Sequence, residues 1–346
     1  MDAVQIANTA FAVDIFKKLA EKDKTSNIIF APLCTSTSLA LAYRAAKGET
    51  ATQMKQGLHL EDVKDVPFGF QTITADASKL SSFYSLKMVK RLYVEKSLNP
   101  TTEFLSSIKR PFPSEFELAD FKDKTEDTRL QINKSVSDLT DGKMENILIE
   151  GSVNDQTKIL LINAAFFVTN WMKKFPENQT KEVKCLFFFI IITNNFACYP
   201  LLMAQDIEDD TTGLEQLEKQ LTPEKMLQWT NPSSMANTKV NVFLPKFKME
   251  TEYDFKPILE SLGMTHMFDE SSSDFSEMSE NKGVVLSRII HKVSLEVVED
   301  GTESRDVPGY RILQHKDEFN ANHPFLFAFK HNKSRSIVFA GRFCSP

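Results

Sequence analysis

The spacing of apolar residues changes from a helical to a strand pattern along the chain. Near the N-terminus, apolar residues recur every three or four positions as far as Phe16, which predicts a helix with one buried side. Residues 27–60 then predict a short strand, an apolar helix that ends at Lys47-Gly48, and a second helix from about Thr50. The first third of the chain is therefore predicted to be mainly helical.

Strand patterns dominate the later part of the chain. Residues 158–171, KILLINAAFFVTNW, are apolar almost without interruption, which predicts a strand buried on both faces. Residues 85–99 also alternate as a strand, and three further strand patterns follow position 238. Residues 124–148 predict another helical stretch, which Asp141-Gly142 interrupts. Helices early and strands late predict an α+β protein in which strands pair over long distances.

The composition narrows the class of protein. A chain of 346 residues with 42% hydrophobic and 25% charged residues is typical of soluble globular proteins, and it contains no repeat or Gly/Ser linker. We therefore expect residues 1–346 to form one domain. The net charge of −6 argues against nucleic acid as a partner. The longest apolar run, residues 186–192, is too short to span a membrane, and the N-terminus lacks the pattern of a cleavable signal peptide.

Motifs for catalysis or metal binding are missing from the sequence. There is no GxSxG, phosphate loop, dinucleotide loop, HExxH or EF-hand pattern. The four cysteines form no CxxC pair, and such sparse thiols are typical of a reducing compartment. His291 lies in an apolar strand pattern, where a hydrogen-bonded core histidine is favoured over a catalytic one. We predict no catalytic residue, no metal site and no cofactor, so an enzyme is the weaker hypothesis.

Two groups of basic residues allow two interpretations. Either group could bind a polyanion, or its charges could prevent edge-to-edge pairing of an exposed strand. The sequence leaves both interpretations open, and the second is the commoner explanation. The groups are Lys87, Lys90, Arg91 and Lys96, and Lys330, Lys333 and Arg335.

Four stretches, in order along the chain, resemble the serpin family. They are residues 27–54, 163–171, 244–303 and 323–346. The resemblance implies the serpin fold, with a helical N-terminal part, a large central sheet A, and sheets B and C. It also implies a monomer with an exposed reactive-centre-type loop at about residues 299–318, and the FCSP terminus resembles the ovalbumin-like, intracellular branch.

The resemblance assigns roles to individual residues. Trp171 is similar to the tryptophan at the breach of sheet A, and Ser36, Ser38 and His291 to its shutter. Arg311 and Ile312 resemble the reactive-centre bond, which offers an arginine to trypsin-like proteases. The hinge of the loop corresponds to Glu299, Asp300, Gly301 and Thr302.

The sequence of the loop opposes its entry into a sheet. Alternate residues of an inserted strand enter the core and must be small and uncharged. Asp306 would be a buried carboxylate without an evident partner, and Pro308 would lack a ladder N–H in the middle of the sheet. In the other register, Glu303 and Arg305 would be buried instead. We therefore expect a non-inhibitory serpin that acts by binding proteins, possible partners being matrix or cell-surface components; the alternative is a protease inhibitor with Arg311 as bait.

One segment departs from the family. Residues 183–201 do not resemble serpins, and the chain between Trp171 and position 201 is too short for the strands of sheets B and C that serpins place there. We expect those strands to be missing or replaced, with a severe loss of stability. The resemblance also implies cytoplasmic and extracellular pools of the protein.

Overall fold

The computed structural model describes nine stretches of the chain, and the structural statements below concern these residues. They are residues 2–79, 84–169, 190–191, 196–201, 213–231, 241–243, 246–297, 318–320 and 324–345. The helices are α1 (Asp2–Lys22), α2 (Pro32–Ala45), α3 (Gly48–Gly57), α4 (Val66–Ala77), α5 (Thr102–Ile108), α6 (Thr125–Leu139), α7 (Glu215–Gln220), α8 (Pro223–Trp229) and α9 (Lys256–Ser261). The strands are β1 (Ile28–Phe30), β2 (Tyr84–Glu95), β3 (Phe116–Ala119), β4 (Ile159–Thr169), β5 (Ile190–Ile191), β6 (Phe196–Leu201), β7 (Asn241–Phe243), β8 (Phe247–Asp254), β9 (Leu286–Val297), β10 (Glu318–Asn320), β11 (Phe325–His331) and β12 (Ser336–Phe343).

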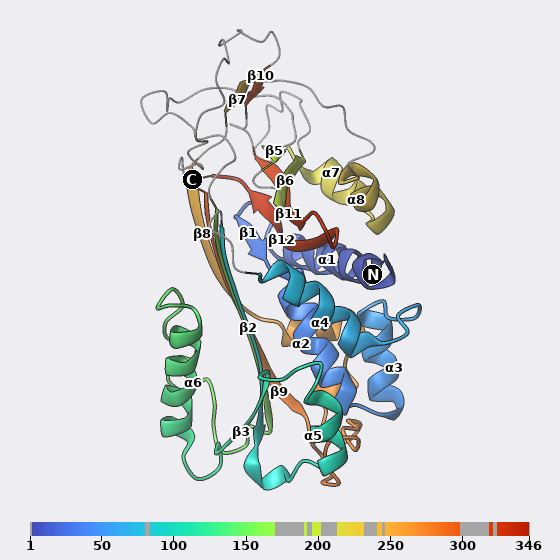
Figure 1. The fold of residues 1–346 in the computed structure, drawn as a ribbon, viewed down its shortest axis with the longest axis vertical. Coiled ribbons are helices and arrows are strands. Elements are labelled where there is room, and N and C mark those ends of the chain that lie inside the picture. Colours follow the sequence, from blue (N-terminus) through green and yellow to red (C-terminus); the bar gives the residue numbers. More distant parts are fainter. Residues whose placement is uncertain are drawn as a thin grey trace.

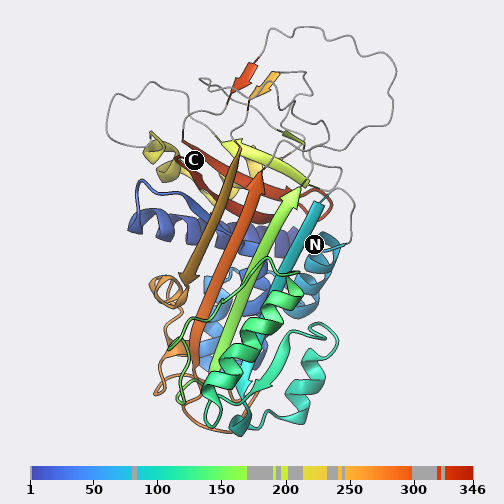
Figure 2. The same ribbon diagram turned by 90° about the vertical axis from the view of Figure 1, so that its left-hand side faces the viewer.

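A five-stranded sheet in the order β3-β2-β4-β9-β8 runs the length of the molecule (Figure 1, Figure 2). Figure 1 shows α6 on one side of this sheet and α1 to α5 on the other. The prediction of a strand buried on both faces is confirmed for β4. Ile162 and Phe166 pack with the side chains beneath α6, whereas Leu161 and Phe167 join the larger core on the opposite face.

A second five-stranded sheet, in the order β1-β12-β11-β6-β5, brings the two ends of the chain together. Strand β1 pairs antiparallel with β12, so Ile28 lies opposite Arg342. Helix α1 packs against β12. Strands β7 and β10 form a short parallel sheet. None of the described helices combines the length and apolar character needed to cross a membrane.

The helical stretch predicted over residues 124–148 is a helix only up to the predicted break at Asp141-Gly142, and its part beyond that break is not helical. Helix α6 ends at Leu139, and Thr140 closes it by donating from its hydroxyl to the Val136 carbonyl at 2.8 Å. Asp141 and Gly142 then adopt positive φ angles of 53° and 73°, which a helix does not permit. The segment that follows lies over the large sheet and leads into β4.

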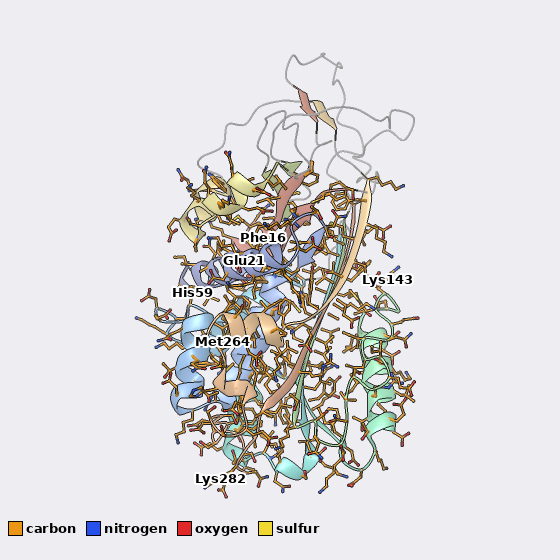
Figure 3. The ribbon with its side chains drawn as sticks, turned by 180° about the vertical axis from the view of Figure 1, so that it is seen from behind. Phe16, Glu21, His59, Lys143, Met264 and Lys282 are labelled. Carbon is orange, nitrogen blue, oxygen red and sulfur yellow. The ribbon has the colours of Figure 1, made fainter. Side chains whose placement is uncertain are left out.

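The helical layer is tied together at the end of α3. His59 Nε2 lies 2.7 Å from Asp14 Oδ2 on α1, and this hydrogen bond is the main reason that the pKa of His59 is raised. Figure 3 shows His59 in this layer, whereas Lys143 lies on the α6 side of the sheet. The Lys143 ammonium stands 5.6 Å from the centre of the Phe166 ring there. Electrostatic contacts therefore support both layers that cover the sheet.

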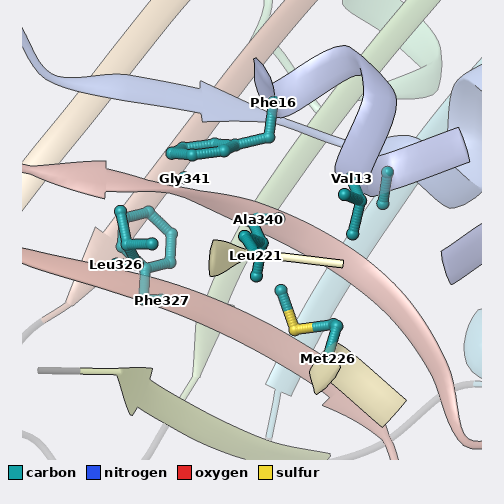
Figure 4. A pocket seen from close by; sticks show the side chains of 9 residues that line it. Val13, Phe16, Leu221, Met226, Leu326, Phe327, Ala340 and Gly341 are labelled. Atoms are coloured by element: carbon teal, nitrogen blue, oxygen red, sulfur yellow. The ribbon is translucent and has the colours of Figure 1, made fainter. Parts of the chain in front are cut away.

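A small apolar pocket lies between α1, α8 and the second sheet. Its cavity of about 10 Å³ is lined by residues that include Phe16, Met226, Phe327 and Gly341 (Figure 4). A space of this size holds at most one water molecule, and its apolar lining offers that water few partners. The pocket is therefore a packing defect between layers and too small for an organic ligand.

Candidate functional site

The centre of the large sheet is a seam between two parallel strands. Strand β4 pairs directly with β9 over ten residues, from Ile159 opposite Leu286 to Val168 opposite Glu296. No strand lies between β4 and β9, so the sheet is closed at this position. Any chain segment that entered the sheet here would first have to break these backbone hydrogen bonds.

Lys158 fastens the end of the seam at which β4 and β9 begin. Its backbone N–H donates to Ser287 Oγ at 2.9 Å, and its Nζ donates to the Gly283 carbonyl at 2.9 Å. The same ammonium forms an ion pair with Glu270 at 3.0 Å. Because Ser287 and Gly283 belong to β9 and its approach, these bonds hold the starts of the two strands together.

The segment between α6 and β4 is also attached to β9. Arg288 Nη1 donates to the Ser152 carbonyl at 2.8 Å, and Lys292 Nζ donates to the Glu145 carbonyl at 3.2 Å. Both carbonyls belong to the chain that crosses from α6 to β4. Separation of β9 from β4 would therefore break these two charged hydrogen bonds in addition to the backbone ladder.

His291 occupies the middle of the seam on the α2 side and is fully buried. Its Nε2 accepts a hydrogen bond from the Ala31 N–H at 3.0 Å, and its Nδ1 lies 3.2 Å from Thr35 Oγ1. A neutral ring with its proton on Nδ1 satisfies both contacts, because the Thr35 hydroxyl can then donate to the Ala31 carbonyl at 3.3 Å. Burial lowers the pKa of His291 to about 3. The ring is therefore a neutral link between β9 and α2.

The four hydroxyl residues at the start of α2 point to four different neighbours. Only Thr35 reaches His291. Ser36 Oγ donates to Asn8 Oδ1 on α1 at 3.1 Å, and Ser38 Oγ donates to the Thr35 carbonyl at 2.9 Å. Both serines are buried and fully engaged inside the helical layer, so the structure does not place them on His291.

Asn163 faces His291 across the seam. The two residues are Cα partners in the β4–β9 ladder, and Asn163 is fully buried. Neither its Oδ1 nor its Nδ2 has a hydrogen-bond partner among the described residues. The seam therefore carries an unsatisfied amide next to the neutral imidazole.

The residues predicted for the breach, hinge and reactive-centre bond lie outside the described residues. They are Trp171, Glu299, Asp300, Gly301, Thr302, Asp306, Pro308, Arg311 and Ile312. Trp171 follows β4, whereas the hinge and reactive-centre residues lie between β9, which ends at Val297, and β10, which begins at Glu318.

Comparison with known proteins decides the family. The profile described as serpin, a serine protease inhibitor, matches residues 6–191 and 188–346. The chain belongs to the serpin family. Serpin B5 of mouse (Mus musculus) is 56% identical over 375 aligned positions, which cover 100% of both chains.

Solved structures agree with this assignment. A crystal structure of maspin has a TM-score of 0.93 at 54% identity and covers 100% of this chain and 99% of its own. A 2.1 Å structure of a tumour suppressing serpin has a TM-score of 0.90 at 54% identity, with 100% of both chains covered. The predicted fold and resemblance are thus confirmed. Residues 63–99, 135–148, 224–237 and 307–325 resemble maspin in sequence.

This serpin lacks residues that the mouse protein has. The alignment with the mouse protein has about 29 positions more than this chain has residues. The two matches to the family profile meet at residues 188–191, within the segment that the sequence marks as unlike serpins. Strands β5 and β6 come from this segment, and β6 pairs with β11, so part of the segment completes the second sheet.

The buried histidine and the two buried thiols of this serpin are poorly suited to catalysis. Both ring nitrogens of His291 are engaged, and its low pKa keeps it neutral, so it cannot act as a general base. Burial raises the pKa of Cys34 to about 12 and that of Cys198 still further, which keeps both thiols protonated. Among the described residues, no three His, Cys, Asp or Glu side chains could hold a metal ion. Membership of the serpin family places the chain with protease-inhibitor-fold proteins, not with enzymes.

Four residues of the seam were not found from the sequence. Lys158 and Arg288 bond to groups that are distant along the chain, Asn163 lies opposite His291 in the ladder, and no local pattern marks those neighbours. Thr35 could have been found from its place beside Ser36, because consecutive hydroxyl residues of a helix face different directions. Only the packing of α2 against β9 decides which hydroxyl meets His291.

Proposed function

We propose that this serpin does not trap proteases and acts by binding proteins in cell adhesion, migration and growth control. The observation that carries the proposal is the pair Asp306 and Pro308 at alternate positions of the loop. A protease-trapping serpin must insert that loop as a new strand in its large sheet. A carboxylate and a proline oppose this step in different ways, and the other register would bury Glu303 and Arg305.

The surroundings of the seam support this proposal. A strand between β4 and β9 would place its alternate side chains in the apolar layer beneath α6 and in the core around His291. On the α6 face, Arg288 and Lys292 already donate to backbone carbonyls, and burial of an unpaired carboxylate costs several kcal/mol, on the order of its desolvation. Opening of the seam would also break the bonds of Lys158, Arg288 and Lys292 described above.

The binding surface that we propose is residues 307–313 of the loop together with a neighbouring basic patch. The partners are proteins, which include matrix or cell-surface components, and the protein occupies cytoplasmic and extracellular pools. The similarity to a tumour suppressing serpin supports a role in growth control rather than in proteolysis.

A second candidate function is inhibition of a trypsin-like protease. It is favoured by Arg311, which stands at the position of the reactive-centre bond, and by the family's description as serine protease inhibitors. In this case the protease recognises Arg311 and is then captured by loop insertion, whereas in the leading proposal Arg311 is an ordinary cleavage site.

Incubation with trypsin distinguishes the two functions. We expect cleavage between Arg311 and Ile312 and no complex that survives denaturing electrophoresis, because acyl-enzyme hydrolysis outpaces an opposed insertion. The Arg311→Gln variant is the control, since it should resist cleavage at this bond and leave all other cuts unchanged. A denaturation-resistant complex that forms with the unmodified chain and is absent with Arg311→Gln would instead establish the inhibitor.

A further inference from the structure

Helix α3 ends at a position where helices favour glycine. The Leu60 N–H donates to the Lys55 carbonyl at 2.9 Å, and the His59 N–H donates to the Gln56 carbonyl at 3.0 Å. These two bonds form a Schellman motif, in which the residue after the helix cap takes a left-handed backbone. Here that residue is His59, with a φ of 55°. Glycine adopts this conformation without steric cost, so the structure around His59 must hold its backbone there.

Two buried leucines hold this turn. Leu58 and Leu60 are at most 1% exposed, and both belong to the main core. The side chain of His59 lies between these two anchors along the chain and is 38% exposed. The leucines therefore keep the backbone of the turn in place, while water can still exchange protons with the ring.

The charged groups that act on the His59 ring are carboxylates. Its Nε2 lies 2.7 Å from Asp14 Oδ2 on α1, and Glu61 follows two positions later in the chain. The hydrogen bond to Asp14 is the largest cause of the raised pKa of His59; burial opposes it, and the charges of Asp14 and Glu61 add to it. Lys55 on α3 and His266, on the 3₁₀ turn that contacts α3, contribute nothing to this shift of the pKa. The ring thus binds its proton more tightly in the folded chain than an exposed histidine does.

We propose that His59 and Asp14 form a pH-sensitive latch, which fastens the end of α3 to α1 while the imidazole is protonated and loosens when the imidazole loses its proton. The protonated ring makes a charge-assisted hydrogen bond to the carboxylate, and the C-terminal end of α3 favours its positive charge. A neutral ring donates a weaker hydrogen bond. The left-handed turn is then held less firmly, and so is the chain that leads from α3 to α4.

The latch closes in acidic solution and opens in alkaline solution. Because the pKa of His59 is raised above its ordinary value of 6.5, the pair contributes its full stability below pH 6.5. That contribution is lost as the pH rises through the pKa of the folded chain. Residues 58–65 connect α3 to α4, so these are the residues that the open latch releases. The latch lies in the helical layer and does not depend on the loop at residues 299–318 or on its function.

Hydrogen exchange on the full chain tests the proposal. Mass spectrometry follows the peptide that covers residues 55–65 at about pH 6 and about pH 9, and each rate is divided by the intrinsic exchange rate at the same pH. Helix α6 serves as the internal reference for global unfolding. We expect the protection of residues 55–65 to fall at least about threefold at the higher pH relative to α6, because the proton stabilises only the closed latch.

Three variants connect this effect to the pair. Asp14→Asn removes the carboxylate, and His59→Asn removes the titrating ring but keeps a residue that tolerates a left-handed backbone. Both should show nearly equal protection at the two pH values. The matched control is Glu21→Gln in the same helical layer (Figure 3), which breaks the exposed pair with Lys18 on α1 and should behave like the unmodified chain.

Two results would overturn the proposal. They are equal protection of the unmodified chain at both pH values, and a pH dependence that survives in Asp14→Asn or His59→Asn. If a variant does not fold, NMR titration of the His59 ring in the unmodified chain decides instead. A midpoint above pH 6.5 that coincides with the loss of protection supports the latch, and any other midpoint contradicts it.

Discussion

Replacement of Gly341 by alanine is expected to destabilise the protein by about 4 kcal/mol, a loss that is exceptional for one methyl group. Gly341 lies in β12, where β1 crosses close to it. A Cβ at this position would overlap the carbonyl oxygen of Ile28, and it would stand 2.8 Å from Cζ of the Phe327 ring. The carbonyl belongs to the backbone of the paired strand, so relief requires β1 and β12 to separate.

The melting temperature of purified Gly341→Ala measures this effect. The matched control is Gly69→Ala in α4, whose added Cβ would meet only the side chain of Val4. The Val4 side chain can yield more easily than a paired backbone, and alanine favours a helix, so the control should lose much less in melting temperature than Gly341→Ala. If the two variants melt at similar temperatures, β1 does not approach β12 as closely as the structure shows.

Replacement of Glu218 by glutamine is expected to cost about 3 kcal/mol, because it leaves the buried Arg342 without its carboxylate. The Arg342 side chain is fully buried, and its Nη1 donates to Glu218 Oε1 at 2.8 Å. Its Nη2 donates to the carbonyls of Asp23 and Ser26 at 2.8 and 3.0 Å. These contacts join α7, β12 and the turn after α1, so their loss should loosen both ends of the chain together.

The turn that Arg342 holds is itself built around a carboxylate. Asp23 Oδ1 accepts hydrogen bonds from the N–H groups of Ser26 and Thr25 at 2.9 and 3.0 Å. The bond from Ser26 is the largest of several that lower the pKa of Asp23 to about 2. The turn therefore keeps its shape at neutral pH, and the arginine binds to a preformed pair of carbonyls.

Thermal melting of Glu218→Gln, compared with Glu215→Gln on the same helix, checks the contribution of this pair. The control removes an equal charge from α7 and should melt like the unmodified chain. The double variant E218L/R342M should recover part of the loss, because it removes the buried charge along with its partner. Equal melting of Glu218→Gln and Glu215→Gln would show that the backbone carbonyls alone satisfy Arg342.

Strong local patterns are the part of the fold that the sequence predicts well. The apolar run that became β4 and the helical period that became α1 are examples. Burial on both faces of a strand leaves a continuous apolar run, and burial on one side of a helix leaves apolar residues at every third or fourth position. The break predicted at Asp141-Gly142 marks the end of α6, where their backbone angles stop the helix, whereas the apolar pattern that continues to Leu148 does not form a second helix. The direct pairing of β4 with β9 joins residues more than a hundred positions apart, and no local pattern records it.

The seam illustrates why site residues were harder to predict. Thr35, Ser36, Thr37 and Ser38 follow one another near the N-terminal end of α2, at intervals of about 100° around the helix. They bond to His291, Asn8, Thr74 and the Thr35 carbonyl, respectively. Only the rotation of α2 against its neighbours selects the one that meets His291. The resemblance located the correct turn of the helix, and packing chose the residue.

The most direct test of the central claim, that the loop cannot enter the sheet, is the melting temperature after cleavage at Arg311. Trypsin cuts the folded protein at this bond, and differential scanning calorimetry then compares cut and uncut chains. We predict a change of less than about 3 °C, because Asp306 and Pro308 keep the cleaved loop out of the seam between β4 and β9. Insertion of a complete strand would add several kcal/mol and raise the melting temperature by about 10 °C or more. A rise of that size would contradict the account.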